Sequence, residues 1–142
     1  PAVQQVVDFW KSLGAVPQPM SPEDHDRVMA RTSHLPHIIA SVLSTTVGRN
    51  ADQAMLGMFC GPGFRDTTRV AEGAPQVWID ILRTNHRFIL EELQAFKAEL
   101  DQLCHFMDSG QSDQIRQFLE TGRERRQRLV AQKTAEGTSK AS

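Results

Sequence analysis

Residues 89–107, ILEELQAFKAELDQLCHFM, decide the fold class of this chain. Large apolar residues recur there in alternating steps of four and three, a set we call the a/d stripe: Ile89, Leu93, Phe96, Leu100, Leu103 and Met107. This spacing is typical of a helix that packs along one face against another helix. The second helix could belong to the same chain or to another subunit, and the spacing leaves both alternatives open.

Other segments also have the pattern of helices. Apolar side chains recur at helical steps in residues 1–14, and Gly14 is suited to end that helix. We expect further helices at residues 51–59, 64–72, 76–107 and from about 113 onward.

The sequence also predicts where another helix begins and where it bends. Ser21 followed by Pro22 is typical of a helix start, because serine caps the free N–H groups and proline fits the first helical position. Pro36 lies further along the same pattern. Proline lacks a backbone N–H and its ring clashes with the carbonyl four residues earlier, so we expect a kink near His34.

No segment alternates apolar and polar residues next to hairpin turns, so the predicted fold class is all-α, with long antiparallel helices. The chain has 142 residues, of which 39% are hydrophobic, enough for one domain with its own core. We place this domain at residues 1–133. Residues 134–142 are small and polar, and we expect a disordered tail there.

Composition argues against several classes of partner. The net charge is −1, and no apolar stretch approaches the roughly 20 residues that span a bilayer, so we expect neither nucleic-acid nor membrane binding. Residues 121–142 carry six Lys or Arg against two Glu, which we interpret as a solvated helix face, with nucleic-acid binding as the weaker alternative. Cys60 and Cys104 lack metal-type spacing and fit free thiols in the cytoplasm.

Histidines form the first candidate site. His34 and His37 are three residues apart and therefore lie on one face of a helix. The residues leave three alternatives open: a metal site that still lacks a third ligand, buried structural histidines, or an anion-binding pocket. His25, next to Asp26, adds another imidazole. Trp78 could form an apolar wall of such a pocket or pack in the core.

Residues 61–69, GPGFRDTTR, form the second candidate site. Glycine turns before a helix, here around Gly63, present free N–H groups to anions. Asp66 could orient the guanidinium of Arg69, which would then bind a carboxylate through two hydrogen bonds. The alternative is an ordinary surface ion pair between the two side chains.

These blocks, in this order, resemble the C-terminal helical domain of prephenate dehydrogenases and their arogenate-using relatives. The resemblance covers nearly the whole chain and rests on Phe9-Trp10, Leu13-Gly14-Ala15, Met20 to Asp26, Ser33 to His37, Gly63 to Ala71, Trp78 to Ile81 and Asn85.

The resemblance implies an enzyme of tyrosine biosynthesis. It would oxidatively decarboxylate prephenate to 4-hydroxyphenylpyruvate, or arogenate to tyrosine, with NAD or NADP. An N-terminal Rossmann domain would hold the cofactor and the catalytic histidine. The helical domain would form a homodimer and close one side of the substrate cleft. No catalytic residue or metal ligand is expected in it. The matching positions imply substrate binding by Arg69, His37, His25, Trp78 and Gly63, with Arg69 on a carboxylate of the dianionic substrate.

Two departures qualify this expectation. No G-x-G-x-x-G sequence follows a predicted strand, so the Rossmann domain is missing and we expect the segment alone to be inactive. It begins at Pro1, which suits a part of a longer chain. Pro62 stands where relatives commonly have glycine, which removes one backbone donor.

The alternative function is a non-enzymatic helical dimerisation module.

Overall fold

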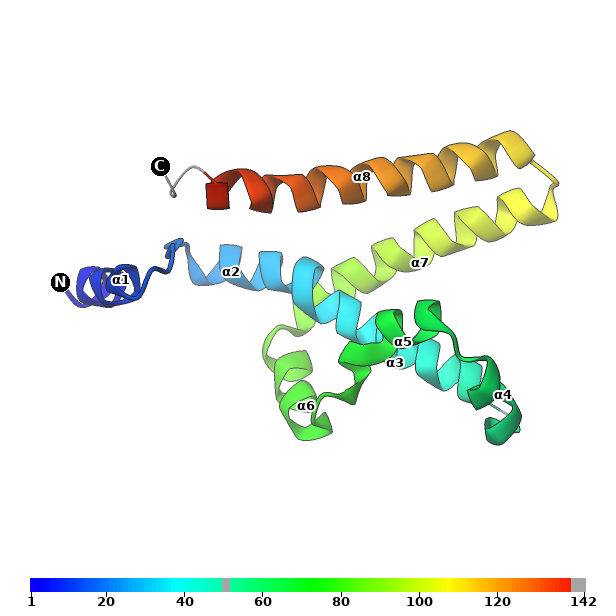
Figure 1. Cartoon of the computed structure of the whole chain (residues 1–142), viewed down its shortest axis with the longest axis horizontal. Helices are drawn as coiled ribbons and strands as arrows, with labels where there is room; N and C mark the ends of the chain where they lie inside the picture. Colours follow the sequence, from blue (N-terminus) through cyan, green and yellow to red (C-terminus); the bar gives the residue numbers. More distant parts are fainter. Residues whose placement is uncertain (50–51, 139–142) are drawn as a thin grey trace. The chain divides into compact units, whose positions relative to one another are not determined.

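The computed structural model describes residues 1–49 and 52–138, with side chains up to residue 131. Every regular element in these ranges is helical (Figure 1), which confirms the all-α prediction. Residues 1–93 and 94–142 form two compact units, and each is described by itself. The predicted domain, residues 1–133, includes parts of both units.

The first helix ends where the sequence predicted. Helix α1 (Ala2–Ser12) is followed by Gly14, whose φ of 81° lies in the left-handed region that favours glycine. Apart from Val7, which is half-buried, the side chains of α1 are exposed. This helix therefore buries little of its apolar face within the first unit.

The long helical stretch through the histidines contains a wider turn. Helix α2 (Pro22–Met29) begins as predicted, with the Ser21 hydroxyl accepting a hydrogen bond from the Asp24 N–H at 3.0 Å. A π-helical turn, η1 (Ala30–His34), then leads into α3 (Leu35–Gly48). The Leu35 N–H bonds to the Ala30 carbonyl, five residues back. The expected kink near His34 takes the form of this π turn, next to the proline that lacks an N–H.

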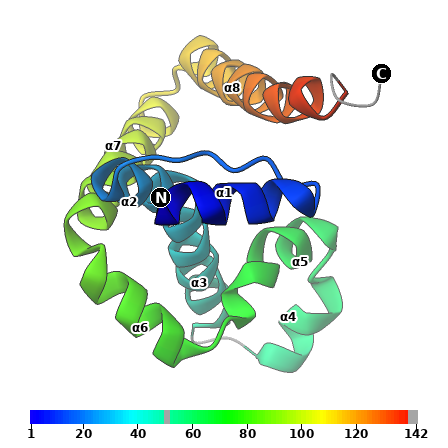
Figure 2. The ribbon, with the colours of Figure 1, turned by 90° about the vertical axis from the view of Figure 1, so that its left-hand side faces the viewer.

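Three short helical elements follow: α4 (Gln53–Phe59), α5 (Pro62–Thr68) and the 3-10 turn η2 (Arg69–Glu72). The expected start of the first, residue 51, lies outside the described residues. Helix α5 begins earlier than the expected residue 64, because Gly61 serves as its cap and proline suits the first position. Gly63 therefore lies inside the first turn of the helix. Helix α3 packs against both η2 and α5 (Figure 2).

The expectation of one continuous helix over residues 76–107 is wrong. Two helices, α6 (Pro75–Thr84) and α7 (His86–Asp108), are separated by Asn85, which has φ −107° and ψ 28°. The Asn85 side chain donates a hydrogen bond to the Asp26 carbonyl at 2.7 Å. Asparagine gains little in a helix interior, and this distant bond holds it in a non-helical conformation.

The second unit is an antiparallel helix pair. Helix α7 ends at Asp108, one residue after the expected residue 107, and Gly110, with φ 64°, turns the chain into α8 (Ser112–Thr138) (Figure 1). Arg125 of α8 lies 4.0 Å from Glu99 of α7. The backbone of α8 runs past the start of the expected tail at residue 134. Residues 139–142 lie outside the described part, so the disordered tail stays a prediction.

The buried core is smaller than the sequence predicted. Among the described residues, the buried apolar side chains are Ala30, Ala40 and Ile89, and buried His37, Thr68 and Asn85 accompany them. Each helix meets its neighbours over a short length, so large apolar side chains stay exposed on most elements. None of the described helices is long and apolar enough to cross a membrane.

A substitution at Ile89 tests the contribution of this small core to stability. Among the buried apolar side chains of the described residues, Ile89 is the one large side chain, with 3% exposed. We predict that Ile89→Ala lowers the free energy of unfolding by about 2–4 kcal/mol, since it removes buried methyl groups and leaves a cavity. Urea unfolding followed by circular dichroism measures the change. Leu90→Ala is the control, since Leu90 is 43% exposed on the same helix. An equal loss in both variants would contradict the prediction.

Candidate functional site

The centre of the candidate site is a stack of two rings. The imidazole of His37 on α3 and the indole of Trp78 on α6 lie face to face, with ring centroids 3.4 Å apart and planes 7° from parallel. Burial lowers the pKa of His37, and a hydrogen bond with the Val70 backbone partly opposes this shift. Burial therefore favours the neutral form of the His37 ring. The stack is a flat, mostly apolar surface that carries imidazole and indole nitrogens at its edges.

Gly73 makes this stack possible. A Cβ atom at residue 73 would lie 2.5 Å from Nε1 of Trp78 and 3.0 Å from Cε1 of His37. Real Cβ atoms do not approach other atoms so closely, so any side chain there would displace the indole. The backbone of residue 73 thus forms one wall against both rings. The sequence indicated Gly73 only as part of a helix break.

Arg69 lies next to the residue that His37 contacts. It opens η2, one position before Val70, and its side chain is exposed. Among the described residues, its guanidinium forms neither an ion pair nor a hydrogen bond. The ion pair expected with Asp66 is absent there, so the prediction that Asp66 orients Arg69 is wrong. Both side chains are exposed at the end of α5, where water competes for the charges.

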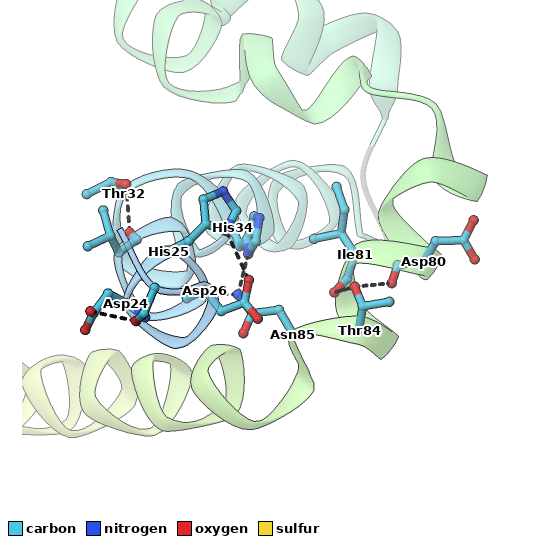
Figure 3. A network of polar contacts seen from close by, with 11 residues as sticks. Asp24, His25, Asp26, Thr32, His34, Asp80, Ile81, Thr84 and Asn85 are labelled. Carbon is cyan, nitrogen blue, oxygen red and sulfur yellow. Dashed lines mark hydrogen bonds and ion pairs between the residues drawn. The ribbon is translucent and has the colours of Figure 1, made fainter. Parts of the chain in front are cut away.

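His34 also contacts Trp78. Its ring meets the indole edge-on, with centroids 6.0 Å apart and planes at 86°. Its Nδ1 lies 3.3 Å from Nδ2 of Asn85, and the same amide donates to the Asp26 carbonyl (Figure 3). Burial lowers the pKa of His34, whereas the Asp26 carboxylate raises it and His25 lowers it.

His25 lies on the exposed side of this group. Its Nδ1 is 3.1 Å from the Oδ1 of Asp26, and both side chains are largely exposed. Figure 3 shows His25, Asp26, His34 and Asn85 gathered where α2 and η1 meet the junction of α6 and α7. The polar network therefore joins segments that are about 60 residues apart in sequence.

A cavity of about 440 Å³ extends from the stack along α3 and α6. His37, Gly73 and Trp78 line it, together with mostly apolar side chains of those helices. Arg69, His25 and Gly63 are not among the lining residues. A Cβ added at Gly63 would meet nothing within 4 Å, so no close approach requires glycine at that position.

The structure thus brings part of the predicted set together. His37 and Trp78 line one cavity, whereas Arg69 and His25 do not line it. Arg69 directly precedes Val70 in η2, and His25 forms its contact with Asp26. Gly63 takes no part in these contacts, and its predicted role in substrate binding stays a prediction.

Sequence reasoning did not select Asn85 or Gly73 as site residues. The signal for Asn85 was a poor helix former inside a long helical pattern.

Metal binding was one of the alternatives for the histidines. Among the side chains that the structure describes, in residues 1–49 and 52–131, no group of three or more His, Cys, Asp or Glu residues is placed to hold a metal ion. Two imidazoles beside an indole instead provide neutral hydrogen-bonding groups at an apolar surface. This arrangement suits a ring-shaped ligand with polar substituents.

The fold and these residues belong to a known class of helical domain. Residues 21–121 match the family described as "Prephenate dehydrogenase, dimerization domain", and the chain belongs to this family. It is 35% identical over 135 residues to a cyclohexadienyl dehydrogenase of Zymomonas mobilis, covering 94% of this chain and 45% of that protein. It is 31% identical over 129 residues to a prephenate dehydrogenase of Bacillus subtilis, covering 90% and 35%.

Solved structures agree with these matches. An arogenate dehydrogenase from Synechocystis superposes with a TM-score of 0.78 at 27% identity, covering 90% of this chain and 47% of that one. A prephenate dehydrogenase from A. aeolicus, solved with hydroxyphenyl propionate and NAD+, gives 0.81 at 29% identity, covering 89% and 45%. The chain therefore spans less than half the length of the relatives it matches.

Gly73→Ala tests the close contact with the stack. We predict that the added methyl group displaces the indole of Trp78, separates it from His37 and exposes it to water. In a Trp10→Phe background, Trp78 is the single tryptophan, and its fluorescence should shift to longer wavelength. Gly57→Ala is the control, since a Cβ there meets nothing within 4 Å. Identical spectra for the Gly73 and Gly57 variants would refute the contact.

Proposed function

We propose that this chain is the C-terminal part of a prephenate or arogenate dehydrogenase. In this proposal it forms the homodimer and the carboxylate-binding side of the substrate cleft. The observation that carries the proposal is the His37–Trp78 stack, with the unpaired Arg69 next to the backbone that His37 contacts. Family membership and the length of the relatives support a separate nucleotide-binding domain in the complete enzyme.

The site fits the chemistry of such a substrate. Prephenate carries two carboxylates and a ring hydroxyl, so its site needs one flat apolar surface and several donors at the edges. The stack supplies the surface, and Arg69 supplies a cation with five N–H donors. A guanidinium with no anion of its own among the described residues can pair fully with a substrate carboxylate.

The reaction itself needs little from these residues. In oxidative decarboxylation, a hydride leaves the carbon that bears the ring hydroxyl, and the bond to the ring carboxylate breaks to release carbon dioxide. The electron pair of that bond enters the ring, which becomes aromatic, and the proton that leaves the hydroxyl as its carbon is oxidised returns to the oxygen of the phenol. NAD or NADP, bound by the other domain, would accept the hydride. The neutral imidazole of His37 and the cation of Arg69 would bind and orient the substrate, and neither would have to exchange a proton.

Exposure of three side chains of the a/d stripe, Phe96, Leu100 and Met107, supports the homodimer. In the second unit, α7 turns Glu99, Gln102 and Phe106 toward a groove that it shares with α8. Leu100 and Met107, which belong to the stripe, lie on another side of α7 and stay exposed. Helix α8 therefore leaves Leu100 and Met107 of the stripe uncovered. Of the two alternatives for its partner, a second subunit is the better supported.

Other functions have less support. A non-enzymatic dimerisation module would need the stripe but would have no use for the stacked rings and the unpaired cation. Nucleic-acid binding would rest on the arginines of α8, of which Arg125 and Arg128 already lie beside Glu99 and Glu124. Location in the cytoplasm stays a prediction.

Arg69→Ala tests the carboxylate-binding role in the complete enzyme. We predict a KM for prephenate or arogenate that is roughly 10- to 150-fold higher, because a charge-assisted hydrogen bond is lost. Steady-state kinetics measure the change. Arg65→Ala is the matched control, since Arg65 is an exposed arginine one turn earlier that the proposal does not use. An unchanged KM in the Arg69 variant would remove the assigned role.

Leu100→Asp tests the dimer interface. We predict that the wild-type chain sediments as a dimer at micromolar concentration and that the variant sediments as a monomer, because a carboxylate would be buried in an apolar contact. Ala98→Asp places the same charge on the opposite side of α7 and should leave the dimer intact. A monomeric wild-type chain would count against the proposed homodimer.

A further inference from the structure

Asn85 has a fixed amide orientation. The side chain is buried, with 6% exposed, and its Nδ2 lies 2.7 Å from the carbonyl oxygen of Asp26. Exchanging the amide nitrogen and oxygen would place two acceptors at that short distance. The group facing Asp26 must therefore be the NH₂ group.

This orientation decides the protonation of His34. The same Nδ2 lies 3.3 Å from Nδ1 of His34. An amide nitrogen can only donate, so Nδ1 must be the acceptor and carries no proton. The proton of the neutral ring is then on Nε2. The two N–H groups of Asn85 thus donate to two different elements. One donates to the Asp26 carbonyl of α2 and the other to Nδ1 of His34 in η1.

The side-chain oxygen of Asn85, Oδ1, makes no hydrogen bond to the described residues in this arrangement. This oxygen is also buried. Buried acceptors are nearly always paired in folded proteins. A residue whose only task was to end α6 would not need to leave a buried oxygen unpaired. Orienting the two donors is the feature that this arrangement preserves.

We propose that Asn85 is a positioning residue that holds His34 in the Nε2–H form, so that the ring presents a neutral hydrogen-bond donor beside Trp78. The proposal rests on the proposed function in one respect, that the acceptor for this donor is an oxygen of the substrate. The His34 ring that would carry this donor lies edge-on to Trp78, with ring centroids 6.0 Å apart.

The charged neighbours of His34 explain why asparagine suits this position. The Asp26 carboxylate favours the protonated ring, whereas burial and His25 favour the neutral one. A carboxylate at position 85 would add a second negative charge and would accept a proton from Nδ1. It would favour the imidazolium and, in the neutral ring, the opposite tautomer. The neutral amide of asparagine has the same length as the aspartate side chain but adds no charge beside His34.

The test is ¹⁵N nuclear magnetic resonance of histidine side chains in this 142-residue chain. Long-range ¹H–¹⁵N spectra distinguish a protonated ring nitrogen from an unprotonated one, and a His34→Gln variant assigns the signals. We expect the wild-type His34 at pH 8 to show an unprotonated Nδ1 and a protonated Nε2. A protonated Nδ1 in the wild-type chain would overturn the proposal, whatever any variant does.

Asn85→Asp supplies the second measurement. We expect the pKa of His34 to rise by about one unit or more and the proton to move to Nδ1 in the neutral ring. Thr84→Ala is the matched control, because Thr84 lies beside Asn85 and bonds only to carbonyls of its own helix. A folded Asn85→Asp variant with the wild-type tautomer and pKa would show that Asn85 does not control His34.

Kinetics of the complete enzyme separate this inference from the proposed function. We expect Asn85→Asp to move the acid limb of the pH profile of kcat/KM to higher pH, because His34 stays charged there and loses its neutral form. An unmoved profile, together with a changed tautomer, would overturn the role of His34 as a substrate donor. Failure of the Arg69 test would count against the proposed function and would leave the tautomer result standing.

Discussion

The contact between Gly73 and the stacked rings of His37 and Trp78 is the constraint on which the site depends. It joins α3, η2 and α6 at one point, since His37 bonds the Val70 backbone while residue 73 closes against both rings. A Cβ atom at residue 73 would lie 2.5 Å from Nε1 of Trp78, so there is no room for a side chain beside the stack. The position of the two rings in the cavity depends on this close approach.

Polar contacts replace much of the missing apolar core in the first unit. Asn85 connects the junction of α6 and α7 to α2 and η1, and Arg31 of η1 lies 2.7 Å from Glu92 of α7. Such contacts contribute more to the geometry than to the stability of the fold. The free energy gained in each contact is largely offset by the cost of removing water from the polar groups. The apolar side chains of the a/d stripe that stay exposed, Phe96, Leu100 and Met107, fit a domain that completes its packing in a dimer.

Several features could be predicted because they depend on local chemistry. The caps at Ser21 and Gly14 act over one helical turn, and the stripe of α7 needs only the helical period. The family resemblance rests likewise on short blocks of residues. Helix boundaries were less accurate around Asn85 and Pro62, where a distant hydrogen bond or a favourable cap changed the expected limits.

The sequence by itself determined the all-α class, the order of the helices and the family, because composition, period and motif order are properties of the chain alone. Only the tertiary structure decided that Gly73 touches two rings, that Asn85 orients His34, and that Asp66 does not pair with Arg69. Each of these facts depends on distances of a few ångströms between separate elements or on the exposure of charged side chains. No local pattern specifies such distances, because they are set by how whole helices pack.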